Sequence, residues 1–258
     1  MTSNQLDTIV LFGDSITQGG WEAGGFAQRL AYVYARKLDV INRGLSGYNS
    51  EWGLPVFEQI VPKKAEQPHV PTMRMLFIWF GANDACLEQS PQYVPLPKFR
   101  DNLRKFVGIL RLESSEYYHP KELTKIFLIS PPPVDEAART ADLAKRDPPL
   151  APDREFDNTK RYAEAVKEVG LELEVPVIDA WTGIWEAAEQ NVENLKNFLP
   201  DGLHLNTTSY EIVYDLIIKS ITENYPELHY SNLKMVFPPW SEIDWEDPKP
   251  TLQARKAL

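Results

Sequence analysis

Cysteine is nearly absent from this chain of 258 residues, which contains only Cys86. A single cysteine cannot form an intramolecular disulfide or a multi-cysteine metal site, and its scarcity is compatible with a reducing compartment. We expect Cys86 to be a small, buried apolar side chain. Histidine is also scarce, because the chain has four, and they do not show the spacing of a zinc motif such as H-E-x-x-H. We therefore expect neither a metal ion nor another cofactor.

Basic residues are outnumbered by acidic ones, 27 to 37, which gives a formal net charge of −10. Such a chain would be repelled by phosphate backbones and by anionic membrane surfaces. No apolar run approaches the roughly 18 residues of a membrane span, and residues 1–8 lack the basic start and apolar stretch of a secretory signal. We expect no nucleic-acid partner, no membrane span and a cytoplasmic location.

Short apolar runs alternate along the chain with segments that have helical periodicity. Because each run is short and almost continuously apolar, it is typical of a strand that is covered on both faces. The alternation predicts an α/β domain with a parallel sheet between two helical layers, and ligands then bind beyond the carboxyl ends of the strands. The expected strands are residues 8–12, 40–42, 75–80, 126–130 and 175–178, and the expected helices are residues 26–38, 97–110, 158–174 and 207–224.

Two stretches do not fit this alternation, although no linker divides the chain. Residues 1–225 are expected to form one domain, in which residues 135–157, rich in Pro, Asp, Arg and Ala, form a covering loop or short cap. Residues 226–258 form a tail with many prolines and aromatic residues. We expect this tail to pack on the domain or on a neighbouring copy, which would make the protein a homodimer.

Serine, acid and histidine residues that suit ester hydrolysis occur at the two ends of the domain. Ser15 follows the first apolar run and Gly13, which permits a tight turn from strand to helix. Asp201 and His204 are three residues apart, so their side chains can lie on one side of a turn. Asp201 would then fix the tautomer of His204, whose other nitrogen would act as the base for Ser15. The alternatives are a helix-capping serine and a turn aspartate.

The other three histidines, His69, His119 and His229, have neighbours that are typical of exposed loops. They are therefore weaker candidates for the base than His204. Acyl transfer also needs donors for a developing oxyanion. The backbone N–H of Ser15, the backbone N–H of Gly47 and the side-chain amide of Asn83 are the candidates, although glycine and asparagine also serve as simple turn residues.

Four short blocks, residues 13–17, 42–47, 81–84 and 201–204, resemble in order and spacing the conserved blocks of the SGNH, or GDSL-type, hydrolases. The resemblance implies a three-layer α/β/α sandwich with a flavodoxin-like parallel five-stranded sheet. It also implies that Ser15 is the nucleophile and the first oxyanion donor. By the same resemblance, Gly47 and Asn83 are the other donors, and Asp201 and His204 complete the triad.

Within this family, residues 43–50, 81–86 and 94–97 are most similar to the isoamyl acetate-hydrolysing esterases. This similarity implies hydrolysis of small acyl esters, acetate esters of short alcohols above all. Ile16 replaces the leucine of the family motif, which is an exchange of one apolar residue for another. Two alternatives remain open: an alcohol acyltransferase that uses the same acyl-enzyme, and a non-catalytic binding module on the same fold.

Overall fold

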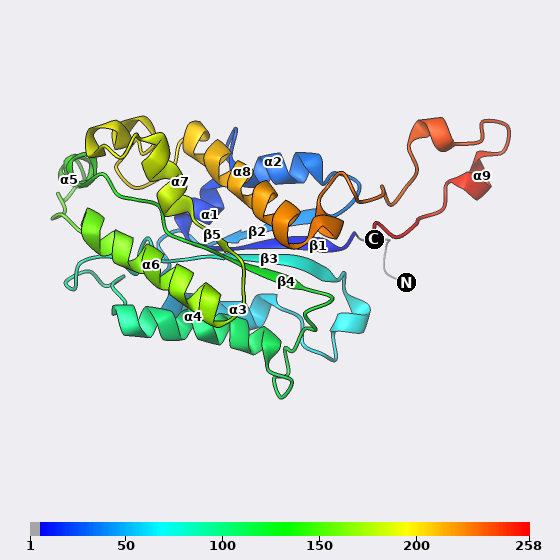
Figure 1. The fold of residues 1–258 in the computed structure, drawn as a ribbon, viewed down its shortest axis with the longest axis horizontal. Helices are drawn as coiled ribbons and strands as arrows, with labels where there is room; N and C mark the ends of the chain where they lie inside the picture. Colours follow the sequence, from blue (N-terminus) through cyan, green and yellow to red (C-terminus); the bar gives the residue numbers. More distant parts are fainter. Residues whose placement is uncertain (1–5) are drawn as a thin grey trace.

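The computed structural model describes residues 6–258 and shows an α/β fold around one five-stranded sheet (Figure 1). The strand order is β2-β1-β3-β4-β5, and each neighbouring pair of these strands is parallel. This architecture confirms the predicted α/β/α sandwich and its flavodoxin-like sheet. The strands are β1 (Thr8–Gly13), β2 (Asp39–Gly44), β3 (Met73–Trp79), β4 (Lys125–Ile129) and β5 (Val177–Ile178).

The strands are apolar along their length because both faces of the sheet are covered. In β1, Ile9 and Leu11 belong to the core on one face, whereas Val10 and Phe12 belong to the core on the other. Successive side chains of a strand point to opposite faces, so a strand between two helical layers buries both sets. This burial explains why the sequence shows short continuous runs rather than alternation of polar and apolar residues.

Helices form a layer on each face of the sheet (Figure 1). One layer contains α1 (Ser15–Gly19), α2 (Phe26–Val33), α7 (Ala180–Ala187) and α8 (Thr207–Asn224). The other contains α3 (Ser50–Ile60), α4 (Leu96–Arg111) and α6 (Phe156–Glu172). The remaining helical elements are α5 (Glu136–Ala144), α9 (Pro248–Thr251) and the 3-10 turns η1 (Gln67–His69), η2 (Val192–Asn197), η3 (Pro226–Leu228) and η4 (Trp240–Glu242). Among the helices of residues 6–258, none has the length and apolar character that a bilayer crossing requires.

Helix α3 is one that the sequence pattern did not predict. Its interior contains Gly53 and Pro55, which both lower helix propensity. The helix forms nevertheless, because the Asn49 side chain accepts a hydrogen bond from the Trp52 N–H at 2.9 Å and because Phe57 is fully buried in the core. Tertiary packing therefore outweighs local propensity in this segment.

The expectation that His119 lies in an exposed loop is wrong, because its side chain is buried. The loop folds back on the end of α4, where the His119 N–H donates to the Leu110 carbonyl at 2.8 Å. Arg111 in turn donates to the His119 carbonyl at 2.8 Å. These backbone contacts hold the ring inside, and burial lowers the pKa of His119 although its bond to the Tyr117 carbonyl opposes this.

The first part of the C-terminal tail packs beside the turn that follows α2. The Tyr34 hydroxyl donates to the Leu228 carbonyl at 2.9 Å, and the Val236 N–H donates to the Arg36 carbonyl at 2.8 Å. The chain then leaves the body of the molecule, as the orange and red segment of Figure 1 shows. On this segment Trp240 and Trp245 are 72% and 76% exposed, with ring centroids 6.1 Å apart.

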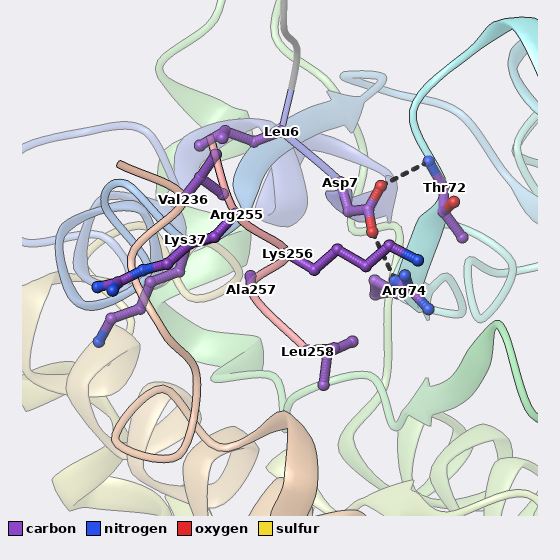
Figure 2. Close-up of a pocket in the computed structure, with 10 residues that line it drawn as sticks. All are labelled: Leu6, Asp7, Lys37, Thr72, Arg74, Val236, Arg255, Lys256, Ala257 and Leu258. Atoms are coloured by element: carbon purple, nitrogen blue, oxygen red, sulfur yellow. Dashed lines mark hydrogen bonds and ion pairs between the residues drawn. The ribbon is translucent and has the colours of Figure 1, made fainter. Parts of the chain in front are cut away.

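The tail returns to the amino ends of β1 and β3 and closes a cavity of about 270 Å³ there (Figure 2). The wall of the cavity includes Asp7, which accepts hydrogen bonds from the Thr72 N–H at 3.0 Å and from Arg74 Nε at 2.7 Å. Arg255 reaches the same cavity, and its N–H donates to the Val236 carbonyl at 2.8 Å. Because Ser15 follows the opposite end of β1, this cavity is separate from the predicted site.

Candidate active site

Ser15 is the first residue of α1, directly beyond the carboxyl end of β1. Asp14 caps this helix, because its Oδ1 accepts a hydrogen bond from the Ile16 N–H at 2.9 Å. The turn requires a glycine at position 13, since a Cβ there would lie 2.2 Å from Thr17 Oγ1 and 2.3 Å from the Trp79 carbonyl oxygen. The sequence Gly-Asp-Ser thus turns the chain sharply and leaves the Ser15 side chain partly exposed at the sheet edge.

His204 and Asp201 lie beside Ser15, as the sequence predicted, although 189 residues separate Ser15 from His204. Ser15 Oγ is 3.0 Å from His204 Nε2, and His204 Nδ1 is 2.6 Å from Asp201 Oδ2. A carboxylate accepts but cannot donate, so Nδ1 carries the proton and the lone pair of Nε2 faces the serine hydroxyl. The arrangement can therefore remove a proton from Ser15.

Asp201 is held in its ionised form by the loop that it belongs to. Burial would raise the pKa of Asp201, but the hydrogen bonds from the His204 ring, the His204 N–H and the Leu203 N–H hold it well below its usual range. Both oxygens of the carboxylate are engaged, so its orientation toward the imidazole is fixed. His204 itself is half-exposed, with 43% of its side chain accessible.

Helix α5 fixes the loop that carries Asp201 and His204. The Asp135 N–H, one residue before α5, donates to the Gly202 carbonyl at 2.9 Å. Gly202 has a φ of +80°, and a Cβ at this position would lie 2.4 Å from the Arg139 nitrogen and from the Asp135 carbonyl oxygen. Only glycine allows this close approach, so the residue that directly follows Asp201 is determined by packing against α5.

Asn83 lies in the turn after β3, and its side chain is almost completely buried. Its Nδ2 donates one hydrogen to the Tyr48 carbonyl at 2.8 Å, and its Oδ1 accepts from Arg154 Nη2 at 2.6 Å. An amide nitrogen carries two hydrogens, so one remains after the bond to Tyr48. The side chain is thus a fixed donor with one hydrogen to give.

The backbone N–H groups of Ser15 and Gly47 donate to no acceptor among residues 6–258. Gly47 has a φ of +80°, a left-handed conformation that suits glycine, and its carbonyl accepts from Gln92 Nε2 at 2.8 Å. Ser15 is the first residue of α1, where a backbone N–H has no intrahelical partner. Both predicted backbone donors are therefore able to bind an oxygen of a ligand.

Three charged residues near the site were missed in the sequence: Arg139, Asp153 and Arg154, all within residues 135–157. Arg139 donates to both carboxylate oxygens of Asp153, at 3.2 and 3.0 Å, and its Nη1 lies 3.7 Å from Asp201 Oδ2. Arg154 bonds to Asp153, to Asn83 and to the Ala82 carbonyl. No local spacing could have revealed their link to the site, because Asn83, Ala82 and Asp201 are far from them in the sequence.

Two buried carboxyl groups, those of Asp14 and Asp84, flank the site, and burial is the largest influence on the pKa of each. It raises the pKa of Asp14 to about 7, against the effect of the bond from Ile16. It raises the pKa of Asp84 to about 6, although the Ser50 side chain and N–H both donate to this carboxyl group. Cys86, two residues later, is fully buried as predicted.

A serine, histidine and aspartate in this hydrogen-bonded order, at the carboxyl edge of a parallel sheet, are the arrangement of a class of hydrolases that act by acyl transfer. Residues 11–212 match the model of the GDSL-like lipase/acylhydrolase family. The chain belongs to this family and is a carboxylic ester hydrolase, as its sequence blocks predicted.

Relatives from several kingdoms are similar to the chain over most of its length. A GDSL esterase/lipase of Arabidopsis thaliana is 34% identical over 96% of this chain and 98% of the relative. An isoamyl acetate-hydrolyzing esterase 1 homolog of Rattus norvegicus is 34% identical, with 95% and 90% covered. The isoamyl acetate-hydrolyzing esterase of Saccharomyces cerevisiae is 30% identical, with 92% and 95% covered.

Solved structures support the same fold. A lipase/acylhydrolase from Enterococcus faecalis superimposes with a TM-score of 0.58 at 27% identity, over 84% of this chain and 96% of that one. A mutant of an acetyl-xylooligosaccharide esterase from Geobacillus superimposes with a TM-score of 0.59 at 19% identity, over 86% and 96%. The second likeness concerns the fold alone.

We predict that Asp14→Asn changes the pH dependence of stability. The carboxyl group has a higher pKa in the folded chain than in the unfolded chain, so its contribution to stability is complete below about pH 4 and is lost as the pH rises through about 7. An amide keeps the cap acceptor but does not ionise. Urea unfolding at pH 4.5 and pH 8 measures the free energy of unfolding of both proteins. Relative to the wild type, the free energy of unfolding of the variant should be higher at pH 8 than at pH 4.5, by at most about 4 kcal/mol.

Asp39→Asn provides the matched control, because Asp39 is exposed at the start of β2. Asp84 is present in every protein compared, so its own titration cancels in the difference to first order. Equal pH dependence of unfolding in wild type and Asp14→Asn would contradict the assignment of a raised pKa to Asp14.

Proposed function

We propose that this chain hydrolyses small acyl esters, acetate esters of short alcohols above all, through an acyl-enzyme on Ser15. The observation that carries the proposal is the chain of hydrogen bonds from Asp201 through His204 to Ser15 Oγ. Two of the relatives, each matched over 90% or more of its length, are named for isoamyl acetate hydrolysis. Their names support the choice of substrate class.

In the first half of the reaction, His204 Nε2 takes the proton from Ser15 Oγ as the oxygen attacks the ester carbonyl. The imidazolium that forms is stabilised by Asp201, which stays ionised throughout. His204 then gives the proton to the departing alcohol, and the acyl group remains on Ser15. In the second half, His204 removes a proton from water, which attacks the acyl-enzyme and releases the acid.

The tetrahedral intermediates carry a negative charge on the former carbonyl oxygen. The N–H groups of Ser15 and Gly47 and the remaining amide hydrogen of Asn83 are the proposed donors to this oxygen. Positioned donors of this kind contribute about 3 kcal/mol each to the transition state, because they need not reorganise during the reaction. Asn83 is the buried side-chain member of the set.

We predict that Ser15→Ala and His204→Ala each lower kcat for p-nitrophenyl acetate by roughly 10⁴-fold or more, because each removes a member of the proton-transfer chain. Both side chains are partly exposed, so the fold should persist. The thermal midpoint, followed by circular dichroism, serves as the control. A folded variant that keeps half of the wild-type rate would exclude that residue from catalysis.

We predict that Asn83→Ala lowers kcat by roughly 10²–10³-fold with little change in KM, since the lost donor acts mainly on the oxyanion. Steady-state kinetics with the same ester measures both constants. Gln59→Ala provides the comparison, because Gln59 is exposed and its amide bonds to the Pro55 carbonyl within α3 rather than to a proposed oxyanion donor. A change confined to KM would count against the proposed role of Asn83.

We predict that activity falls from acetyl to octanoyl esters and that added isoamyl alcohol leaves free acid as the main product. The half-exposed His204 favours water as the acyl acceptor, because solvent can reach the base directly. Gas chromatography of the products separates hydrolysis from alcohol acyl transfer. A new ester as the main product would favour the acyltransferase alternative. A binding module would give neither a burst nor turnover.

A further inference from the structure

We propose that Arg154 is a positioning residue for ester hydrolysis, whose buried guanidinium holds the amide of Asn83 with one N–H aimed at the ester carbonyl. This inference rests on the proposed role of Asn83 as an oxyanion donor. Arg154 comes from residues 135–157, the segment in which the sequence pattern indicated only a covering loop or cap. Its role would be to fix a donor before the substrate arrives.

The Arg154 side chain is buried, with 1% of its surface exposed. All three guanidinium nitrogens are bonded: Nε to the Ala82 carbonyl at 2.8 Å, Nη2 to Asn83 Oδ1 at 2.6 Å, and Nη1 to the Asp153 carboxylate. The planar fork therefore binds two consecutive residues of the turn after β3. A single ammonium could not bond to both with the same geometry.

The partners of Asn83 determine which way its amide faces. A guanidinium only donates, so the atom that faces Arg154 must be Oδ1. The Tyr48 carbonyl only accepts, so the atom at 2.8 Å from it must be Nδ2. Flipping the amide would place two donors against each other and two acceptors against each other. Arg154 thus fixes the nitrogen on the side where the free hydrogen is available.

The positive charge beside Oδ1 has a second effect, because it draws electron density from the amide and makes the N–H a stronger donor. Burying such a charge requires a counter-charge, which Asp153 supplies. Burial would raise the pKa of Asp153, but Arg139 and Arg154 together hold it below its usual range. The carboxylate is therefore a stable anchor for Arg154.

The guanidinium is not needed to attach its own segment to the sheet edge. The backbone does this, since residues 86 and 154 form an antiparallel bridge and the Leu87 N–H donates to the Asp153 carbonyl at 2.8 Å. Asp153 also accepts two hydrogen bonds from Arg139, and these do not involve Arg154. The bonds from the guanidinium to Ala82 and Asn83 are therefore not needed to hold residues 153 and 154 at the sheet edge.

The test is a double-mutant cycle with Arg154→Met and Asn83→Ala, measured as kcat and KM for p-nitrophenyl acetate. Arg154→Met should lower kcat by at least about 10-fold, and by no more than the roughly 10²–10³-fold of Asn83→Ala, with KM nearly unchanged. In the Asn83→Ala background it should lower kcat by less than about 3-fold, because the amide that it positions is gone. The thermal midpoint of each variant is measured alongside.

Arg146→Met is the matched control, because Arg146 lies in the same segment, is half-exposed and bonds to Asp142. It should leave kcat and KM unchanged. If Arg154→Met does not fold, Arg154→Lys replaces it in the cycle. Lysine keeps the charge but lacks the fork, so kcat should fall less than in Arg154→Met when Asn83 is present, and by less than about 3-fold when residue 83 is alanine.

The two possible failures are distinguishable. Equal losses of kcat from the Arg154 substitution in both backgrounds, or a loss confined to KM, would overturn the positioning role. An unchanged kcat in Asn83→Ala alone would instead overturn the proposed oxyanion role of Asn83. Non-additive losses in kcat, with a control at wild-type rate, are the result that we expect.

Discussion

The parallel pairing of β1 with β3 is the constraint on which the site depends. In this register Gly13 lies opposite Trp79, so the two strands end side by side. Ser15 follows the first strand and Asn83 the second, so both residues lie at the same edge of the sheet although they are far apart in the sequence. An antiparallel pair would have sent the two turns to opposite ends of the sheet. Strand direction therefore places the Ser15 hydroxyl and the Asn83 amide at the same edge of the sheet.

Hydrogen bonds and burial give the three carboxyl groups at the site different pKa values. Asp201 stays ionised because three N–H groups point at it, whereas Asp14 and Asp84 have raised pKa values because burial outweighs their hydrogen bonds. The carboxyl group with the lowest pKa of the three is thus the one that contacts the imidazole. Carboxyl groups with nearly the same intrinsic acidity acquire different pKa values through their surroundings alone.

The layered fold and the grouping of Ser15, Asp201 and His204 could be predicted from the sequence because both leave local signals. A strand covered on two faces must be apolar over consecutive positions, and Ser15, Asp201 and His204 lie in short blocks with defined spacing. Helix α3 left no such signal, since Gly53 and Pro55 oppose it and Phe57 stabilises it through distant rings. The exposed context assigned to His119 failed for the same reason, because its burial comes from contacts with the end of α4.

The residues that support the site escaped sequence reasoning because they act through partners that are distant in the chain. Arg154 lies 71 residues from Asn83. Its other distant acceptor is the backbone carbonyl of Ala82, and a sequence pattern cannot reveal a bond to the backbone. The blocks contain the proposed catalytic residues, whereas residues 135–157 contain charged residues that contact two of them. Arg139 extends this support toward Asp201, 3.7 Å away, while it shares Asp153 with Arg154. One charged cluster therefore contacts both Asp201 and Asn83, so the proposed acid and the proposed oxyanion donor are linked through the same three side chains.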